Sequence, residues 1–161
     1  MAGFLQLQGL KGDSENTVFK DFIRIDSMGS EITREIPESA RGNQRAKGHT
    51  NLNNITLSRQ LDKSSTELQK MTATGVVIGT ATIVFANMYG GKMQPYLKYV
   101  LENVILVQYS ISCDSSGEEL PKEDLALGYT KVTWTYTPYD VKGNAGSATT
   151  NNYDLTTDTA G

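Results

Sequence analysis

The stretch LPKEDLALGYTKVTWTYTPYD, residues 120–140, decides the fold because its apolar and polar residues alternate, as they do in a β-strand. The apolar positions are odd up to Tyr129 and even from Val132 onward. A single β-bulge or sharp bend between these two residues accounts for the change of parity. The stretch therefore predicts one long, bent strand that serves two sheets and ends before Pro138.

This strand also carries the only tryptophan of the chain, Trp134. Because neighbouring side chains in a strand point to opposite faces, Trp134 and Tyr136 are expected to point into the core. Thr133 and Thr135 are then expected to face outward. Threonine suits an ordinary solvent face, and a water-filled lumen or a neighbouring subunit is the alternative.

The composition is that of one ordinary globular domain. The chain has 161 residues, 38% of them hydrophobic, and a net charge of −3, so it is long enough for a real core and not basic enough for wholesale nucleic-acid binding. Cys113 is the only cysteine, which makes an intrachain disulfide impossible and indicates synthesis in a reducing compartment.

No targeting or membrane signal is visible. Residues 1–12 lack the charged and apolar regions of a Sec signal peptide, and the longest aliphatic run is only Val104–Val107. We expect a protein made in the cytoplasm, without membrane insertion, that leaves the cell, if at all, by a Sec-independent route.

Further patterns predict seven or eight strands in total and a turn at Gly90-Gly91. The long run Tyr96–Ile111 needs a bend near Glu102-Asn103. The expected fold is all-β and mainly antiparallel, a single β-barrel or two-sheet domain over residues 1–161. The other runs that read as strands are 4–7, 18–25, 55–61 and 80–86.

One short α-helix is predicted, over about residues 64–74. Ser64 and Glu67 have the spacing of a capping box, and Gly75 supplies a left-handed stop. Residues 30–50 contain few apolar side chains and predict a long loop. The polar tail after about residue 143 is expected to be loosely ordered.

No catalytic or metal-binding pattern emerges. His49 and Cys113 are the only histidine and cysteine, and neither has a visible orienting partner. Zinc needs several such ligands at close spacing. The sequence therefore predicts a protein that is not an enzyme and needs no cofactor.

Two loops carry opposite charge. The predicted long loop holds a set of basic residues, and the segment 114–124 is acidic and includes Glu118 and Glu119. Such loops can guide the docking of identical subunits, or they can simply be solvated. The basic residues are Arg34, Arg41, Arg45 and Lys47.

The order of motifs along nearly the whole chain resembles the haemolysin-coregulated protein family, Hcp, of bacterial type VI secretion. The segments that carry the resemblance are FLQL at 4–7 with KGDS at 11–14, LDKSS at 61–65, GG at 90–91, YLKY at 96–99, LENV at 101–104, WTYTP at 134–138 and YDL at 153–155. The chain departs from the family pattern at Ser27-Met28-Gly29, Pro95 and Tyr153.

The resemblance implies a β-barrel subunit with one helix that forms homohexameric rings. The rings would stack into a tube, with sheath and spike proteins as partners, and small effectors would bind in the lumen, where Ser27 is a candidate contact. It also implies that the long loop contacts a neighbouring subunit or the next ring. A phage-like or extracellular contractile-injection tube protein, or a free-standing β-barrel ligand-binding protein or hydrolase, are the alternatives.

Overall fold

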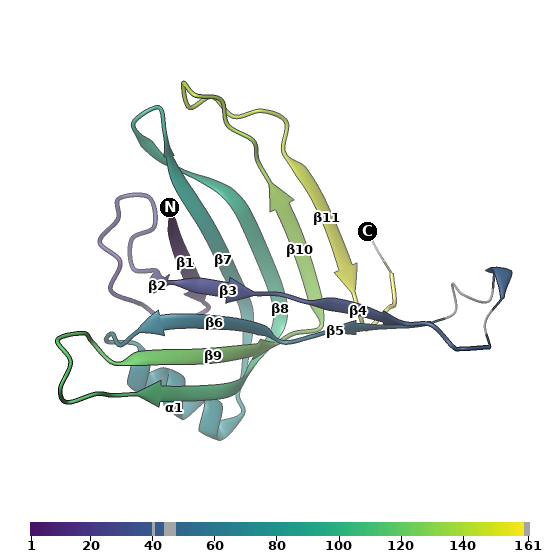
Figure 1. The fold of residues 1–161 in the computed structure, drawn as a ribbon, viewed down its shortest axis with the longest axis horizontal. Coiled ribbons are helices and arrows are strands. Elements are labelled where there is room, and N and C mark those ends of the chain that lie inside the picture. The colour runs from purple at the N-terminus through teal and green to yellow at the C-terminus, as the bar shows by residue number, and fades with distance from the viewer. Residues whose placement is uncertain (40, 44–47, 160–161) are drawn as a thin grey trace.

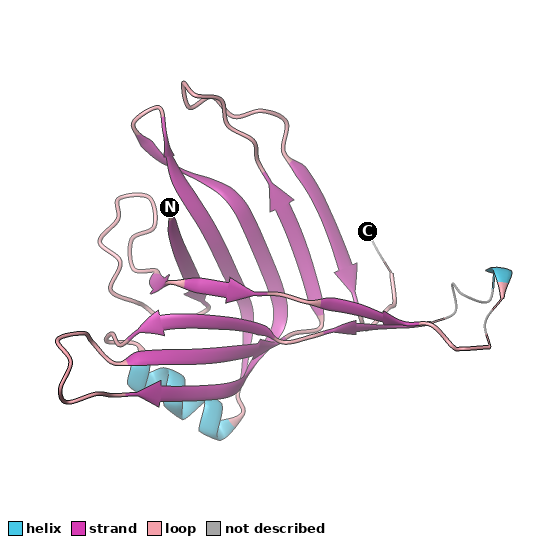
Figure 2. Ribbon diagram, viewed as in Figure 1, coloured by secondary structure: helices cyan, strands magenta, loops and turns pink. Residues whose placement is uncertain are grey.

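The computed structural model describes residues 1–39, 41–43 and 48–159 (Figure 1). It confirms the predicted class: strands dominate, one α-helix is present, and every ladder among these residues is antiparallel (Figure 2). The elements are β1 Ala2–Leu7, β2 Ile23–Ile25, β3 Ser27–Gly29, β4 Ile32–Glu35, β5 His49–Leu52, β6 Ile55–Gln60, α1 Ser65–Thr74, β7 Val77–Tyr89, β8 Lys92–Ser112, β9 Lys122–Gly128, β10 Lys131–Tyr136 and β11 Thr149–Asp154.

The main sheet follows the order β2-β1-β7-β8-β9-β6-β3, with β10 paired to β8 and β11 paired to β10. β2 and β3 follow each other in the chain with only Asp26 between them, yet β2 pairs with β1 and β3 pairs with β6. The two ends of the sheet are thus joined through the chain. The barrel is not closed by a continuous ladder.

A sharp corner divides this sheet into two wings and confirms the predicted bends. β9 and β10 are separate strands that meet at Tyr129 and Thr130, and both pair with the long β8. β8 turns at Asn103, whose φ is 55°, and the opposed β7 turns at Gly79, whose φ is 90°. The Asn103 side chain donates a hydrogen bond to Thr130 Oγ1 at 2.8 Å, which ties the corner together.

We call β1, β10, β11 and residues 80–102 of the β7–β8 hairpin the upper wing. The lower wing comprises β3, β6, β9 and residues 104–112 of β8. Figure 1 shows the two wings meeting at a steep angle. The tip of the hairpin has φ of 57° at Gly90 and 77° at Gly91, as the primed turns of two-residue hairpins require.

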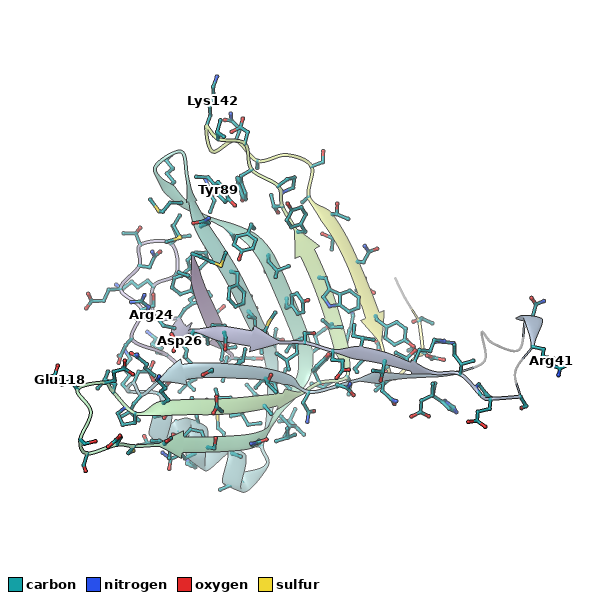
Figure 3. The ribbon with its side chains drawn as sticks, in the orientation of Figure 1. Arg24, Asp26, Arg41, Tyr89, Glu118 and Lys142 are labelled. Atoms are coloured by element: carbon teal, nitrogen blue, oxygen red, sulfur yellow. The ribbon has the colours of Figure 1, made fainter. Side chains whose placement is uncertain are left out.

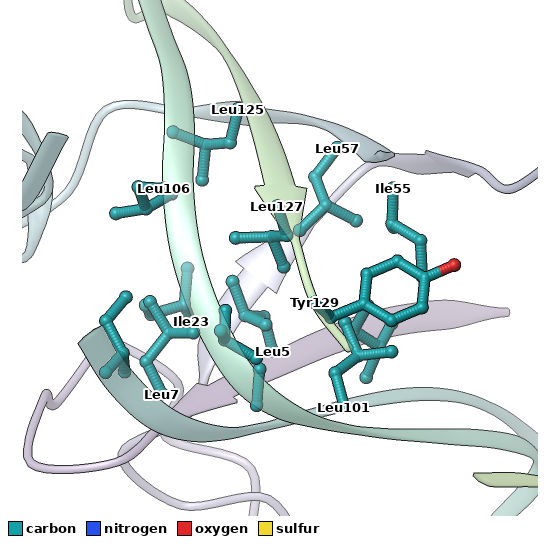
Figure 4. Packing of buried hydrophobic residues seen from close by; sticks show 14 of the residues in the cluster. Leu5, Leu7, Ile23, Ile55, Leu57, Leu101, Leu106, Leu125, Leu127 and Tyr129 are labelled. Carbon is teal, nitrogen blue, oxygen red and sulfur yellow. The ribbon is translucent and has the colours of Figure 1, made fainter. Parts of the chain in front are cut away.

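The main core fills the angle between the wings. The upper wing contributes Leu5 and Leu101, and the lower wing contributes Ile55, Leu57 and Leu127, all at most 2% exposed (Figure 4). Each comes from a strand in which buried and less buried residues alternate, and a smaller second cluster of Phe4, Phe19, Val84 and Ala86 is buried as well. The core therefore depends on the corner that brings the two apolar faces together.

Strand β10, which carries Trp134, only partly matches the burial that was predicted for it. Val132 is buried and Trp134 packs against the core, as predicted. Tyr136 is 52% exposed, so its predicted core position is wrong. It lies opposite Leu97 on β8, two residues farther along β10 than Trp134, where the lower wing no longer covers the upper one.

Helix α1 matches its predicted range, and Gly75 ends it in the left-handed conformation. The predicted capping box is wrong, because Ser64 makes no side-chain cap and is itself helical in φ and ψ. The Ser64 hydroxyl instead bonds to Asp62 and Arg59, and Glu67 contacts Lys70. Competing polar partners in the fold outweigh the local cap.

Two segments predicted to be irregular contain regular structure. Strands β4 and β5 pair with each other inside the predicted loop at 30–50. The predicted loose tail contains β11, which pairs with β10 along its whole length. Both are polar strands with little apolar alternation, so their pairing comes from backbone hydrogen bonds that the side-chain pattern does not reveal.

Candidate functional site

The most prominent surface feature is a projecting pair of strands, β4 and β5, which we call the arm together with the described residues that adjoin them, 30–39, 41–43 and 48–52. β3 continues into β4 and β5 continues into β6, so the arm is an extension of the lower wing. Asn53 donates its backbone N–H and its side-chain amide to Glu31, at 3.2 and 3.1 Å, where the arm leaves the body. Figure 1 shows it pointing away from both wings.

The arm has little to stabilise it within one subunit. Ile32 and Ile36 are 46% and 47% exposed, and β4 and β5 pair only with each other among the described residues. Isolated two-stranded ribbons are marginally stable in water. The arm is therefore suited to lie against another protein surface.

The structure separates the two charged loops. Arg34 and Arg41 belong to the arm, and Arg34 donates to Thr50 Oγ1 at 2.9 Å. Glu118 and Glu119 lie in the acidic loop after β8, and Glu118 lies at the opposite end of the longest axis from Arg41 (Figure 3). One subunit cannot bring these loops together. Arg45 and Lys47 lie outside the described residues.

Ser27 lies on the outward face of the lower wing and is exposed. Strand register places it in one row with Ser58, Asp124 and Ser110 across four strands. A shallow pocket of about 350 Å³ lies over this face and is lined by Ser27, Ser58 and Asp124, among others. The row is polar because the opposite faces of the same strands supply the core.

The upper wing has a similar outward face. In one row across it, Thr82 of β7 lies opposite Val100, which lies opposite Thr133, which lies opposite Asn152. In the next row Thr135 and Thr150 share a hydrogen bond at 3.1 Å. These hydroxyl-rich faces carry few charges and can line a water-filled space.

The structure contains a buried polar cluster around Arg59 that the sequence motifs did not predict. Arg59 on β6 and Glu123 on β9 are both 0% exposed and face each other across the ladder, with 3.1 Å between Arg59 Nε and Glu123 Oε2. The signal was available, since Arg59 shares the parity of Ile55 and Leu57 in an alternating strand.

Two further groups belong to this cluster. The pKa of Tyr109 is raised to about 12. The main cause is burial, followed by the hydrogen bond that Tyr109 makes to Glu123 and by the negative charge of Glu123. Burial favours the neutral form of Asp62, but hydrogen bonds from Ser64 and Arg59 outweigh it, so the pKa of Asp62 lies below its ordinary value of 3.8. Asp62 lines a pocket of about 400 Å³ with Asp13, Arg24 and Asp26, whereas Arg59 and Glu123 are fully buried.

The chain shows no assembled catalytic centre in the described part. His49 lies on β5 of the arm, and Cys113 is exposed just after β8. Within residues 1–39, 41–43 and 48–159, no three His, Cys, Asp or Glu side chains are placed to hold a metal ion. None of the helices formed by these residues has the length and apolar character to cross a bilayer.

Comparison with solved structures identifies close relatives of the fold. A structure described as a type six secretion system protein aligns with a TM-score of 0.91 at 20% identity, over 99% of each chain. Hcp1 from Salmonella typhimurium aligns with a TM-score of 0.77 at 25% identity, over 99% of this chain and 97% of that one. The secreted protein Hcp3 from Pseudomonas aeruginosa gives 0.64 at 18% identity, over 95% and 97%.

Comparison with curated protein sequences gives no match. The family model described as "Type VI secretion system effector, Hcp" matches residues 4–136. This range includes the helix, the arm and both wings, apart from β11. It covers well over half of the chain. The protein therefore belongs to the Hcp family of the type VI secretion system.

Proposed function

We propose that the chain is the subunit of a type VI secretion tube, assembles head to tail into hexameric rings that stack, and is exported while carrying small effectors in the ring lumen. Hcp-family membership supports the tube role. The head-to-tail arrangement is supported by one observation: the arm and the acidic loop are far apart in the subunit. Sheath and spike proteins are the further partners that the family implies.

The geometry favours a heterologous interface. Residues 39–48 contain three basic residues and no acidic ones, whereas residues 113–121 contain three acidic residues and no basic ones. Arg41 and Glu118, from these two segments, lie at opposite ends of the subunit (Figure 3). Complementary patches on opposite sides produce a ring or a filament, whereas a two-fold dimer would use one self-complementary patch.

Charge reversal tests this interface. Arg41→Glu alone, or Glu118→Lys with Glu119→Lys, is expected to raise the dissociation constant of the assembly by about tenfold, because like charges then face each other. Combining all three changes is expected to restore most of the affinity. Sedimentation velocity measures the assembly, and negative-stain imaging shows whether rings form.

Glu67→Lys is the matched control, because it reverses an exposed carboxylate on α1 that is remote from the arm. It is expected to leave assembly unchanged. If the combined variant assembles no better than the single reversals, the arm does not dock on the acidic loop. If the unaltered protein stays monomeric at high concentration, the ring proposal fails.

The lumen proposal rests on the outward row that contains Ser27. Ser27→Arg is expected to leave ring formation intact, since the side chain is exposed, and to abolish export of effectors that need this surface. Thr66→Arg adds the same charge on the exposed face of α1 and serves as the control. Immunoblots of secreted effector and secreted tube protein give the readout. Normal export of every effector by Ser27→Arg would exclude Ser27 as a contact.

A further inference from the structure

Arg59 is a permanently charged group in the dry interior. Its side chain is 0% exposed, and a guanidinium does not lose its proton in proteins. The Nε atom donates to the Gln60 carbonyl at 3.0 Å, and Nη1 donates to Ser64 Oγ at 2.9 Å. Because a buried charge is costly unless it is paired, these neutral acceptors alone do not compensate it.

Two carboxylates supply the missing charge. Glu123 faces Arg59 from β9, and Asp62 contacts Arg59 Nη2 from the turn before α1. Glu123 Oε2 has no hydrogen bond within the described residues, because Arg59 Nε–H is directed to the Gln60 carbonyl. The contact between Arg59 and Glu123 is therefore mainly Coulombic.

The same cluster holds helix α1 at two points. At its beginning, Arg59 donates to Ser64 Oγ and, at 3.4 Å, to Ser65 Oγ. One turn later, Gln69 donates to Tyr109 Oη at 3.2 Å, and Tyr109 donates to Glu123 Oε1. Every polar link from α1 to the sheet in the described residues thus leads to Glu123 or Arg59.

Few apolar side chains of α1 face the core. Leu68 is its single fully buried apolar side chain, and Met71 is partly buried against the core. Gly75, with a left-handed backbone, separates the helix from β7. α1 also forms no part of any strand ladder. It can therefore leave the sheet without breaking the backbone hydrogen bonds of either wing.

We propose that the Arg59 cluster is an acid-sensitive latch: it holds α1 on the lower wing while Asp62 is ionised, and it releases α1 when Asp62 takes up a proton, with both wings still folded. Protonation of Asp62 removes one of the two counter-charges of the buried guanidinium, which is costly. Release of α1 lets water reach it and removes that cost.

The direction of the pH dependence follows from Asp62. Its folded pKa lies below the ordinary 3.8, so its stabilising contribution is complete above that value and is lost as the pH falls through the folded pKa. Arg24, Asp26 and Asp13 line one pocket together with Asp62, so these are the charged groups that face it. Glu67 pairs with Lys70 and Lys63 pairs with Asp13, while Asp124 and Lys122 lie on the outer face or edge of β9.

Hydrogen exchange of the full-length protein tests the latch. After correction for intrinsic exchange rates, amides of α1 are expected to exchange at least about tenfold faster at about pH 2.5 than at neutral pH, while β1 and β7 keep their protection. Glu123→Gln, which cannot ionise, is expected to show fast exchange of α1 already at neutral pH. Tyr109→Phe, a milder change, is expected to have the same effect to a smaller degree.

Glu67→Gln is the control, because it removes an exposed carboxylate of the same helix and is expected to behave like the unaltered protein. Joint loss of protection in α1, β1 and β7 at low pH would overturn the proposal, as would normal protection of α1 in both Glu123→Gln and Tyr109→Phe. The measurement does not depend on ring formation, so its failure is distinguishable from failure of the tube proposal.

Discussion

Arg59→Met is expected to lower the free energy of unfolding by about 3–5 kcal/mol, because it leaves Glu123 and Asp62 without their buried counter-charge. Methionine fills much of the space of the arginine stem, so the loss reports the charge more than a cavity. Guanidinium denaturation at a protein concentration at which the subunit is monomeric gives the value.

The double variant Arg59→Met/Glu123→Leu separates the two causes. Replacing both partners of a buried ion pair by apolar groups is often nearly neutral, so the double variant is expected to recover most of the lost stability. Lys70→Met is the control, since Lys70 forms only an exposed pair with Glu67, and should stay within about 0.5 kcal/mol. A double variant as unstable as Arg59→Met would show that packing, not charge, is responsible.

Gly48→Ala is expected to abolish ring assembly while leaving the body of the subunit folded. A Cβ at Gly48 would lie 1.7 Å from the Glu35 carbonyl oxygen, so the backbone must move at the place where Glu35 pairs with His49. The ladder between β4 and β5 cannot form in its present register. If the arm carries the contact between subunits, the dissociation constant should rise by at least about tenfold.

Gly117→Ala provides a control in the acidic loop, because its nearest atoms would lie at 3.8 and 3.9 Å from the new Cβ and no charge changes. It is expected to assemble normally. Both variants should keep the melting temperature of the isolated subunit, since neither glycine contacts the core. Native mass spectrometry measures the assembly, and intact rings formed by Gly48→Ala would remove the arm from the interface.

The alternating strands could be predicted from the sequence because each buries one face. The parity change after Tyr129 located the corner, and the β-branched run on β8 required the turn that the structure places at Asn103. Gly75 and Gly90 marked the end of the helix and the tip of the hairpin for a local reason, their tolerance of positive φ. Such features depend on neighbours a few residues away.

The arm and β11 could not be predicted in the same way. Their residues are polar on both faces, so no apolar alternation marks them, and their ladders depend on backbone bonds to segments that only the fold brings close. The prediction that Tyr136 is buried was wrong for a related reason. Its parity places it on the same face as Trp134, but the lower wing ends before reaching it. The parity of a strand residue tells which face of the sheet its side chain points to, but it does not tell whether another part of the protein covers that face.

The candidate surfaces show the same division. The sequence by itself determined the class of fold, the single helix, the family and the opposite charges of the two loops. Each of these depends only on residue types and on spacings of a few residues. Only the tertiary structure decided that the loops lie at opposite ends of the subunit (Figure 3). It also paired Arg59 with Glu123, since residues on strands distant in sequence become neighbours only when the sheet assembles.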